Sequence, residues 1–89
     1  MIKKPCVYFL RGIKNNFIYI GSTTNLHFRF NKHQKGLVKS TKAWLPIKLE
    51  FYQEYKTIRE ARQIEYRLKR LKRKDYYEAI IKDRKIKMK

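Results

Sequence analysis

The chain has 89 residues, of which 24 are lysine or arginine and 7 are aspartate or glutamate, giving a formal net charge of +17. This length fits one domain, residues 1–89, with a core at about 6–71 and a basic C-terminal helix and tail at 72–89. A hydrophobic content of 43% excludes global disorder. Charge of this sign attracts polyanions through a field that salt screens.

Neither a membrane span nor an export signal is predicted. No apolar run approaches the roughly 20 residues that cross a bilayer. The first apolar run ends at Arg11 without a small-residue cleavage site. The single cysteine, Cys6, excludes an internal disulfide and a cysteine-rich zinc site, and it is typical of a reducing compartment. We therefore expect a cytoplasmic protein with no membrane partner.

Two strands joined by a hairpin loop are predicted near the start of the chain. Residues 6–11 and 17–20 are rich in β-branched and aromatic side chains. The glycine and asparagines of residues 12–16 suit the loop between them. Because side chains alternate along a strand, positions two apart share a face. These positions are Cys6, Tyr8 and Leu10 on the first strand, and Phe17, Tyr19 and Gly21 at the second.

A helix and a third strand follow. N-cap candidates at 23–25 and Gly36 as the C′ residue predict a helix that runs to about Lys35. Residues 37–46 are basic and predicted to be irregular. Residues 47–55 alternate in hydrophobicity, which indicates a strand. On that strand one face should carry Ile47, Leu49 and Phe51.

Two further helices complete the predicted order ββαβαα. Thr57 and Glu60 form a capping box at the start of the first of them. A last short helix is expected at about 75–81. The apolar stripe of the longer helix consists of Ile58, Ala61, Ile64, Leu68 and Leu71.

Glu65 lies in or beside this stripe, four residues after Ala61 and three before Leu68. A half-buried carboxylate needs a partner, either a cation or a metal ion. The position alone favours an ion pair, for instance with Arg62 or Arg29, since ion pairs commonly satisfy buried charges.

Arg29 and His33 share a helix face, because they are four residues apart. A fixed guanidinium there suits a phosphate. The alternative is an arginine whose stem packs on apolar neighbours while its head stays in water. Taken alone, His33 is more typical of a polar surface residue.

Tyr8 and Tyr19 are expected on neighbouring strands of the hairpin. Tyrosine is common in strands, but a phenol near a metal or a guanidinium can also relay a proton. Gly21, at the end of the second strand, permits close backbone approach or a positive φ. The alternative is that this glycine simply marks a turn at the end of the strand.

Together these residues resemble the GIY-YIG nuclease superfamily, in its small single-domain bacterial branch related to the excision-repair nuclease domain. The resemblance extends from about Cys6 to Leu71, nearly the whole chain. Cys6 stands where the family name has glycine, but the functional tyrosine two residues on is present. The matching elements are Cys6-Val7-Tyr8, Tyr19-Ile20-Gly21, Arg29, His33, and the helix with Glu60-Ala61, Glu65 and Leu68-Lys69.

The resemblance implies a small α/β (α+β) domain, a three-stranded antiparallel sheet flanked by helices. It also implies a metal-dependent DNA endonuclease in DNA repair or processing, with little sequence specificity. Glu65 would hold Mg²⁺ or Mn²⁺, and this implication overrides the ion-pair interpretation. The substrate would be DNA (branched, damaged or single-stranded), with a protein partner supplying targeting. The catalytic residues implied, converging on one side of the sheet, are Tyr8, Tyr19, Arg29, His33 and Glu65.

Two other functions compete with this one. A catalytically idle nucleic-acid-binding domain would need only the basic residues of 69–74, with Tyr76 and Tyr77, for sequence-independent phosphate contacts. A structural ribosome-assembly protein would explain the charge but leave Glu65 and Arg29 unexplained.

Overall fold

The protein is built on a three-stranded antiparallel sheet in the order β2-β1-β3, in a computed structural model that describes residues 4–87. The predicted sheet, its flanking helices and their order are confirmed. One short helix, α2, lies in the segment predicted to be irregular. The strands are Cys6–Gly12 (β1), Ile18–Thr23 (β2) and Ile47–Glu54 (β3), and the helices are Leu26–Gln34 (α1), Lys39–Lys42 (α2), Ile58–Leu71 (α3) and Lys74–Asp83 (α4).

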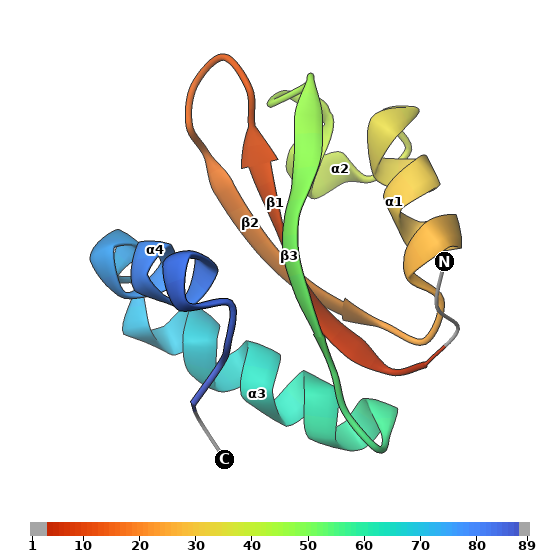
Figure 1. The fold of residues 1–89 in the computed structure, drawn as a ribbon. Coiled ribbons are helices and arrows are strands. Elements are labelled where there is room, and N and C mark those ends of the chain that lie inside the picture. Colours follow the sequence, from red (N-terminus) through yellow and green to blue (C-terminus); the bar gives the residue numbers. More distant parts are fainter. Residues whose placement is uncertain (1–3, 88–89) are drawn as a thin grey trace.

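Helices cover both faces of the sheet (Figure 1). α1 and α2 lie on one side, and α3 and α4 on the other. The predicted alternation along β1 is confirmed, because its side chains divide between two cores. The α3–α4 core contains Val7, Phe9, Ile20, Phe51, Ala61, Ile64, Leu68, Ile80 and Ile86. The α1 core contains Cys6, Tyr8, Leu10, Leu26 and Ile47.

A β-bulge changes the predicted facing of β3. Phe9 pairs with Phe51, but the next residue of β1 pairs with Leu49, so that Glu50 is the extra residue. The bulge shifts the alternation by one position. Ile47 and Leu49 therefore contact the α1 core while Phe51 lies in the α3–α4 core. The prediction that these three residues share a face is wrong.

The bulged residue takes part in an ion-pair network that ties α4 to the sheet. The Arg11 guanidinium donates to the Glu50 carboxylate, and also to both oxygens of Glu78 on α4, at 2.9 Å (Oε2) and 2.5 Å (Oε1). The hydrogen bond from Arg11 lowers the pKa of the Glu78 carboxyl below its usual range. A guanidinium can satisfy two carboxylates at once because its donors form a planar fork.

The predicted helix boundaries rest on caps that the structure contains. Asn25 accepts a hydrogen bond from the Phe28 amide at 3.1 Å, and Gly36 ends α1 with φ of +74°. Thr57 Oγ1 accepts from the Glu60 amide at 3.1 Å, which confirms the cap of α3. The predicted stripe is buried only in part, since Leu71 is 39% exposed at the end of the helix.

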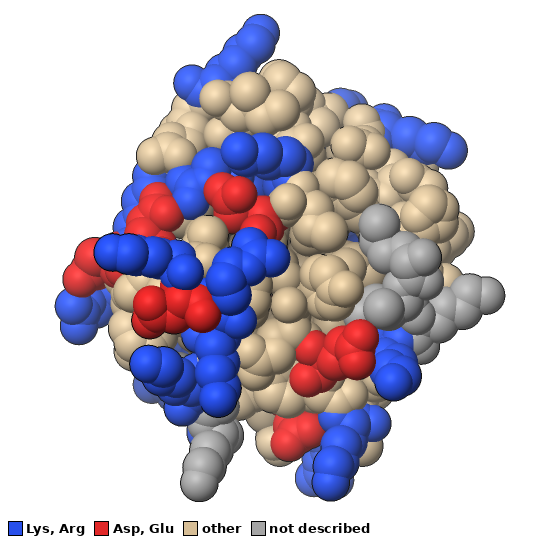
Figure 2. All heavy atoms as spheres, viewed as in Figure 1, with Lys and Arg blue, Asp and Glu red and all other residues tan. Residues whose placement is uncertain are grey.

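Basic side chains dominate the charged surface. Figure 2 shows lysines and arginines gathered over the α3–α4 side of this face, with fewer acidic groups between them, while much of the opposite side is uncharged. Within residues 4–87, no helix combines the length and hydrophobicity needed to cross a bilayer.

Candidate active site

A chain of buried hydrogen bonds links the central strand to α1 and α2. Tyr8 Oη lies 2.9 Å from His33 Nε2, and His33 Nδ1 lies 2.7 Å from Thr41 Oγ1. The Thr41 hydroxyl in turn donates to the Val38 carbonyl at 3.5 Å. These partners assign the proton of His33 to Nδ1, so that Nε2 accepts from the Tyr8 hydroxyl. His33 is 0% exposed, and the interpretation of it as a surface residue is wrong.

The environment keeps both Tyr8 and His33 neutral. Burial, followed by the nearby charge of Arg29, lowers the pKa of His33 to about 4. Burial also raises the pKa of Tyr8; the hydrogen bond with Arg29 opposes this rise without cancelling it. At neutral pH, Tyr8 is therefore a protonated phenol whose proton points at an unprotonated imidazole nitrogen. The pair is arranged to relay a proton rather than to hold a standing phenolate.

Tyr19 and Arg29 complete an aromatic and cationic cluster around this pair. The ring centroid of Tyr19 lies 5.1 Å from that of His33 and 6.3 Å from that of Tyr8. Arg29 is half-buried, and its interactions with the phenols, first that of Tyr8, raise the pKa of its guanidinium. Arg29 is thus fixed against Tyr8 and Tyr19, not simply extended into water, and it still has exposed surface that an anion can reach.

Gly21 lies directly opposite Tyr8 across the β1–β2 pair. A Cβ atom at this position would lie 2.5 Å from Tyr8 Oη and 2.6 Å from Cζ. The phenol ring therefore passes over the glycine backbone, where a side chain would stand. The close approach of the Tyr8 ring, and not a need for a turn, explains the glycine at position 21.

Glu65 joins the cluster from the other layer of the molecule. It lies on α3, which packs on the opposite face of the sheet, and reaches the site at the free edge of β2. Its Oε1 accepts a hydrogen bond from Ser22 Oγ, and its Oε2 lies 2.6 Å from Lys69 Nζ. The charge partner is thus Lys69, not Arg62 or Arg29. The site curves around the edge strand β2, whereas all five side chains were expected on one side of the sheet.

Two residues of this arrangement, Ser22 and Thr41, were not among the predicted site residues, and Lys69 was named only as part of the matching helix and of the basic segment. Lys69 also lies with Nζ 5.4 Å from the centroid of the Tyr19 ring. Its spacing of four residues after Glu65 is the local signal that predicts the ion pair. Ser22 and Thr41 carry no comparable signal, because their contacts depend on tertiary packing.

The oxygen donors fit a hard divalent cation. Among residues 4–87, no group of three or more His, Cys, Asp or Glu side chains could hold a metal ion. Mg²⁺ needs no such cage, since it keeps several waters and commonly binds one or two carboxylates together with substrate phosphates. Glu65, half-buried and hydrogen-bonded by Ser22, is a carboxylate of this kind.

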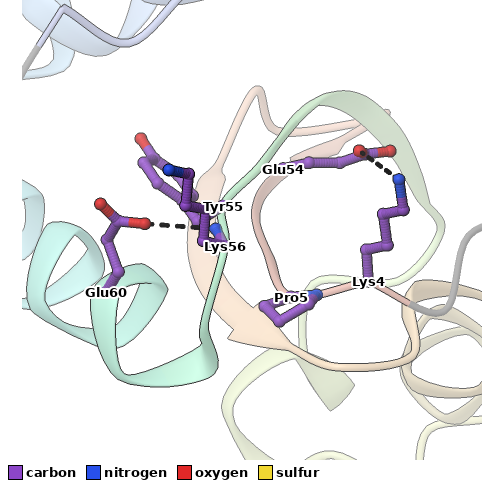
Figure 3. Close-up of a pocket in the computed structure, with 6 residues that line it drawn as sticks. All are labelled: Lys4, Pro5, Glu54, Tyr55, Lys56 and Glu60. Atoms are coloured by element: carbon purple, nitrogen blue, oxygen red, sulfur yellow. Dashed lines mark hydrogen bonds and ion pairs between the residues drawn. The ribbon is translucent and has the colours of Figure 1, made fainter.

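A surface pocket lies elsewhere, between the start of the chain and the β3–α3 turn (Figure 3). Its lining residues are Lys4, Pro5, Glu54, Tyr55, Lys56 and Glu60, none of which belongs to the cluster described above. Its carboxylates already have partners: Glu54 pairs with Lys4 at 3.9 Å, and Glu60 accepts from the Lys56 amide at 3.2 Å. We therefore place the candidate site at Tyr8 and not in this pocket.

Cys6 contributes no chemistry of its own. It is fully buried in β1, and burial, with the charge of Glu54, raises the pKa of its thiol to about 11. A protonated, inaccessible thiol is inert as a nucleophile. With cysteine at this position, Tyr8 two residues on is buried and lies within hydrogen-bond distance of His33.

Comparison with known proteins identifies the family of this chain. The family model for the GIY-YIG catalytic domain matches residues 4–79. The UPF0213 protein YazA of Bacillus subtilis is 40% identical over 68 residues, covering 75% of this chain and 69% of the relative. A UPF0213 protein of Bacillus licheniformis is 36% identical over 69 residues, 76% of this chain and 71% of the relative. A UPF0213 protein of Photorhabdus laumondii is 32% identical over 82 residues, 91% of this chain and 79% of the relative. No solved structure matches. The chain belongs to the GIY-YIG catalytic domain family.

Proposed function

We propose that the protein is a metal-dependent endonuclease that hydrolyses DNA phosphodiester bonds, in DNA repair or processing and with little sequence specificity. The observation that carries the proposal is the arrangement of Tyr8, His33 and Arg29 beside a half-buried carboxylate, Glu65. An aligned proton relay, a fixed cation and an oxygen ligand are what phosphodiester hydrolysis requires.

The proton relay acts on the attacking water. Tyr8 Oη takes the proton of that water while its own proton passes to His33 Nε2, 2.9 Å away. Thr41 fixes the imidazole from the other side, so that Nε2 keeps its lone pair toward the phenol. Tyr19, whose ring lies beside both groups, orients the water. His33 is thus a positioning residue that acts through Tyr8, because its Nε2 pairs with the Tyr8 hydroxyl and its Nδ1 with Thr41.

Arg29 neutralises negative charge that develops on the phosphoryl oxygens. Its contacts with the phenols support this role, because they hold the guanidinium beside the Tyr8 hydroxyl that would take the proton of the attacking water. Mg²⁺ or Mn²⁺, held by Glu65, would polarise the phosphoryl group and stabilise the leaving oxygen. Lysines and arginines of α3 and its C-terminal end supply sequence-independent contacts to the DNA backbone. These residues are Arg59, Arg62, Arg67, Lys69, Arg70, Lys72, Arg73 and Lys74.

The alternative is a nucleic-acid-binding domain without activity. The basic residues favour it as much as they favour the nuclease, but the tyrosines do not. Tyr76 and Tyr77 are half-buried against the α3–α4 core, and the Tyr77 hydroxyl donates to the Leu68 carbonyl at 2.5 Å. They are therefore not free platforms for stacking bases. A binder also has no need for the buried relay of Tyr8, His33 and Thr41.

A cleavage assay separates these functions. End-labelled duplex, single-stranded, nicked and branched DNAs are incubated with Mg²⁺, with Mn²⁺ and with a chelator, using wild-type protein and Tyr8→Phe. Tyr8→Phe removes only the hydroxyl and keeps the ring in the core. We expect metal-dependent cleavage of at least one substrate by wild-type protein, and binding without cleavage by the variant. Equal cleavage by both proteins, or none by either on any substrate, would refute the proposal.

A further inference from the structure

We propose that Lys69 is the resident counter-ion of Glu65, a positioning residue that a divalent metal ion must displace. The inference rests on the proposed function, because it assumes that the metal binds at Glu65. It starts from one contact: Lys69 Nζ lies 2.6 Å from Glu65 Oε2, one helical turn along α3. A glutamate four residues before a lysine is the favourable orientation of such a pair.

The two oxygens of the carboxylate have different partners. Ser22 Oγ donates to Oε1 from β2, while the ammonium of Lys69 occupies Oε2. The Ser22 contact fixes Glu65 against the sheet. A metal ion entering the first coordination shell of Glu65 competes with Lys69 for Oε2, because two cations cannot share that oxygen without strong repulsion.

Lys69 is also the partner that can move. Its side chain is 47% exposed, compared with 19% for Glu65. A lysine head on a four-carbon stem is free to swing, whereas Glu65 is held by Ser22. The Tyr19 ring offers a second position within reach, since Nζ already lies 5.4 Å from its centroid. When the metal takes Oε2, the ammonium therefore stays beside the site, next to the place where a phosphate would bind.

Because the metal ion must displace Lys69 from Glu65, the apparent affinity of the wild-type protein for metal should be lowered. Removing the charge of Lys69 frees Oε2 and removes the repulsion of a nearby cation. A partly exposed ion pair contributes modestly, but repulsion of a divalent ion adds to it, so we expect the Kd for Mn²⁺ to fall about three- to tenfold.

The test measures metal binding without DNA and without catalysis. Free Mn²⁺ is followed by electron paramagnetic resonance during titration of wild-type protein, Lys69→Met, Lys69→Gln, Glu65→Gln and Lys82→Met. Lys82→Met is the matched control, because it removes the same charge from an exposed position on α4. Melting curves establish that each variant is folded. We expect tighter Mn²⁺ binding by both Lys69 variants, unchanged binding by Lys82→Met, and loss of binding by Glu65→Gln.

Two kinds of failure are distinguishable. If Glu65→Gln binds Mn²⁺ as well as wild type, or if no protein binds it, the metal site of the proposed function is refuted. If Glu65→Gln loses binding while the Lys69 variants equal wild type or bind more weakly, the metal site stands and the counter-ion role of Lys69 is refuted. If Lys82→Met increases the affinity for Mn²⁺ as much as the Lys69 variants do, the counter-ion role of Lys69 is also refuted, since net charge alone would then explain the change.

Discussion

Replacing Gly21 with alanine tests the packing that holds Tyr8. The new Cβ would lie 2.5 Å from Tyr8 Oη and 2.6 Å from Cζ, so one group must move by nearly 1 Å to reach an ordinary contact of 3.4 Å. Tyr8 is 1% exposed and cannot swing into solvent. The ring must shift, which lengthens its 2.9 Å hydrogen bond to His33.

Two effects should lower the free energy of unfolding of Gly21→Ala. Overpacking of a core costs about 1–3 kcal/mol, and leaving a buried hydrogen-bonding group without its partner costs about 1–3 kcal/mol. Restricting the unfolded chain by Gly→Ala offsets at most about 1 kcal/mol. The net loss is about 1–6 kcal/mol, which lowers the melting temperature of a domain this size by at least roughly 4 °C.

Thermal unfolding followed by circular dichroism measures this loss, and the cleavage assay measures its effect on the site. Gly12→Ala is the matched control, because its Cβ would meet the side chain of Asn15, which is exposed in the hairpin loop and can rotate. We expect the free energy of unfolding of this control to fall by less than about 1 kcal/mol. A Gly21→Ala protein that melts within 2–3 °C of wild type, a shift of well under about 1 kcal/mol, would show that the β1–β2 pair adjusts freely and that our account of Gly21 is incorrect.

Four further outcomes are expected. Arg29→Ala should lower the cleavage rate by about 10²–10³ while leaving most DNA binding intact; cleavage at the wild-type rate would make it an ordinary surface arginine. Thr41→Val should weaken the relay, lowering both cleavage and melting temperature, since a buried partner of His33 is lost at about 1–3 kcal/mol; an unchanged rate would separate Thr41 from the site. The pKa of His33 in the folded state, about 4, lies below its usual 6.5, so the unfolded state binds more protons between these values. The free energy of unfolding should therefore fall by up to about 3 kcal/mol on acidification from pH 6.5 to 4. Unfolding free energies of wild type and His33→Gln, measured by urea titration, should converge across this range, and a constant difference between them would contradict the assignment. DNA binding measured by anisotropy should weaken steeply with salt and depend little on sequence, and an affinity that is flat across salt would exclude the electrostatic account.

Local patterns in the sequence predicted much of this fold, and tertiary contacts account for what they missed. Strict alternation in β1 and the caps at Asn25 and Thr57 are local, and they were correct. The bulge at Glu50 is not local: it depends on how β3 meets β1, and alternation alone cannot reveal an extra residue. The burial of His33 likewise depends on α2, which brings Thr41 to its ring from eight residues away. The proposed metal-binding role of Glu65 rests on the resemblance, since position alone favoured an ion pair, and the structure contains such a pair with Lys69.

The place of β1 in the middle of the sheet has a consequence for motion. Tyr8 is paired with Gly21 on one side and with Tyr52 on the other, so its strand has no free edge. Amide protons of a doubly paired central strand exchange with solvent only when the whole domain opens, whereas a strand at the edge exchanges through local fluctuations. In deuterium exchange the amide of Tyr8 would thus belong to the slowest segment of the chain, and that of Ser22, on edge strand β2, to a faster one. One half of the site is then as rigid as the domain itself, while Ser22, which contacts Glu65 from the edge strand, can adjust with that strand.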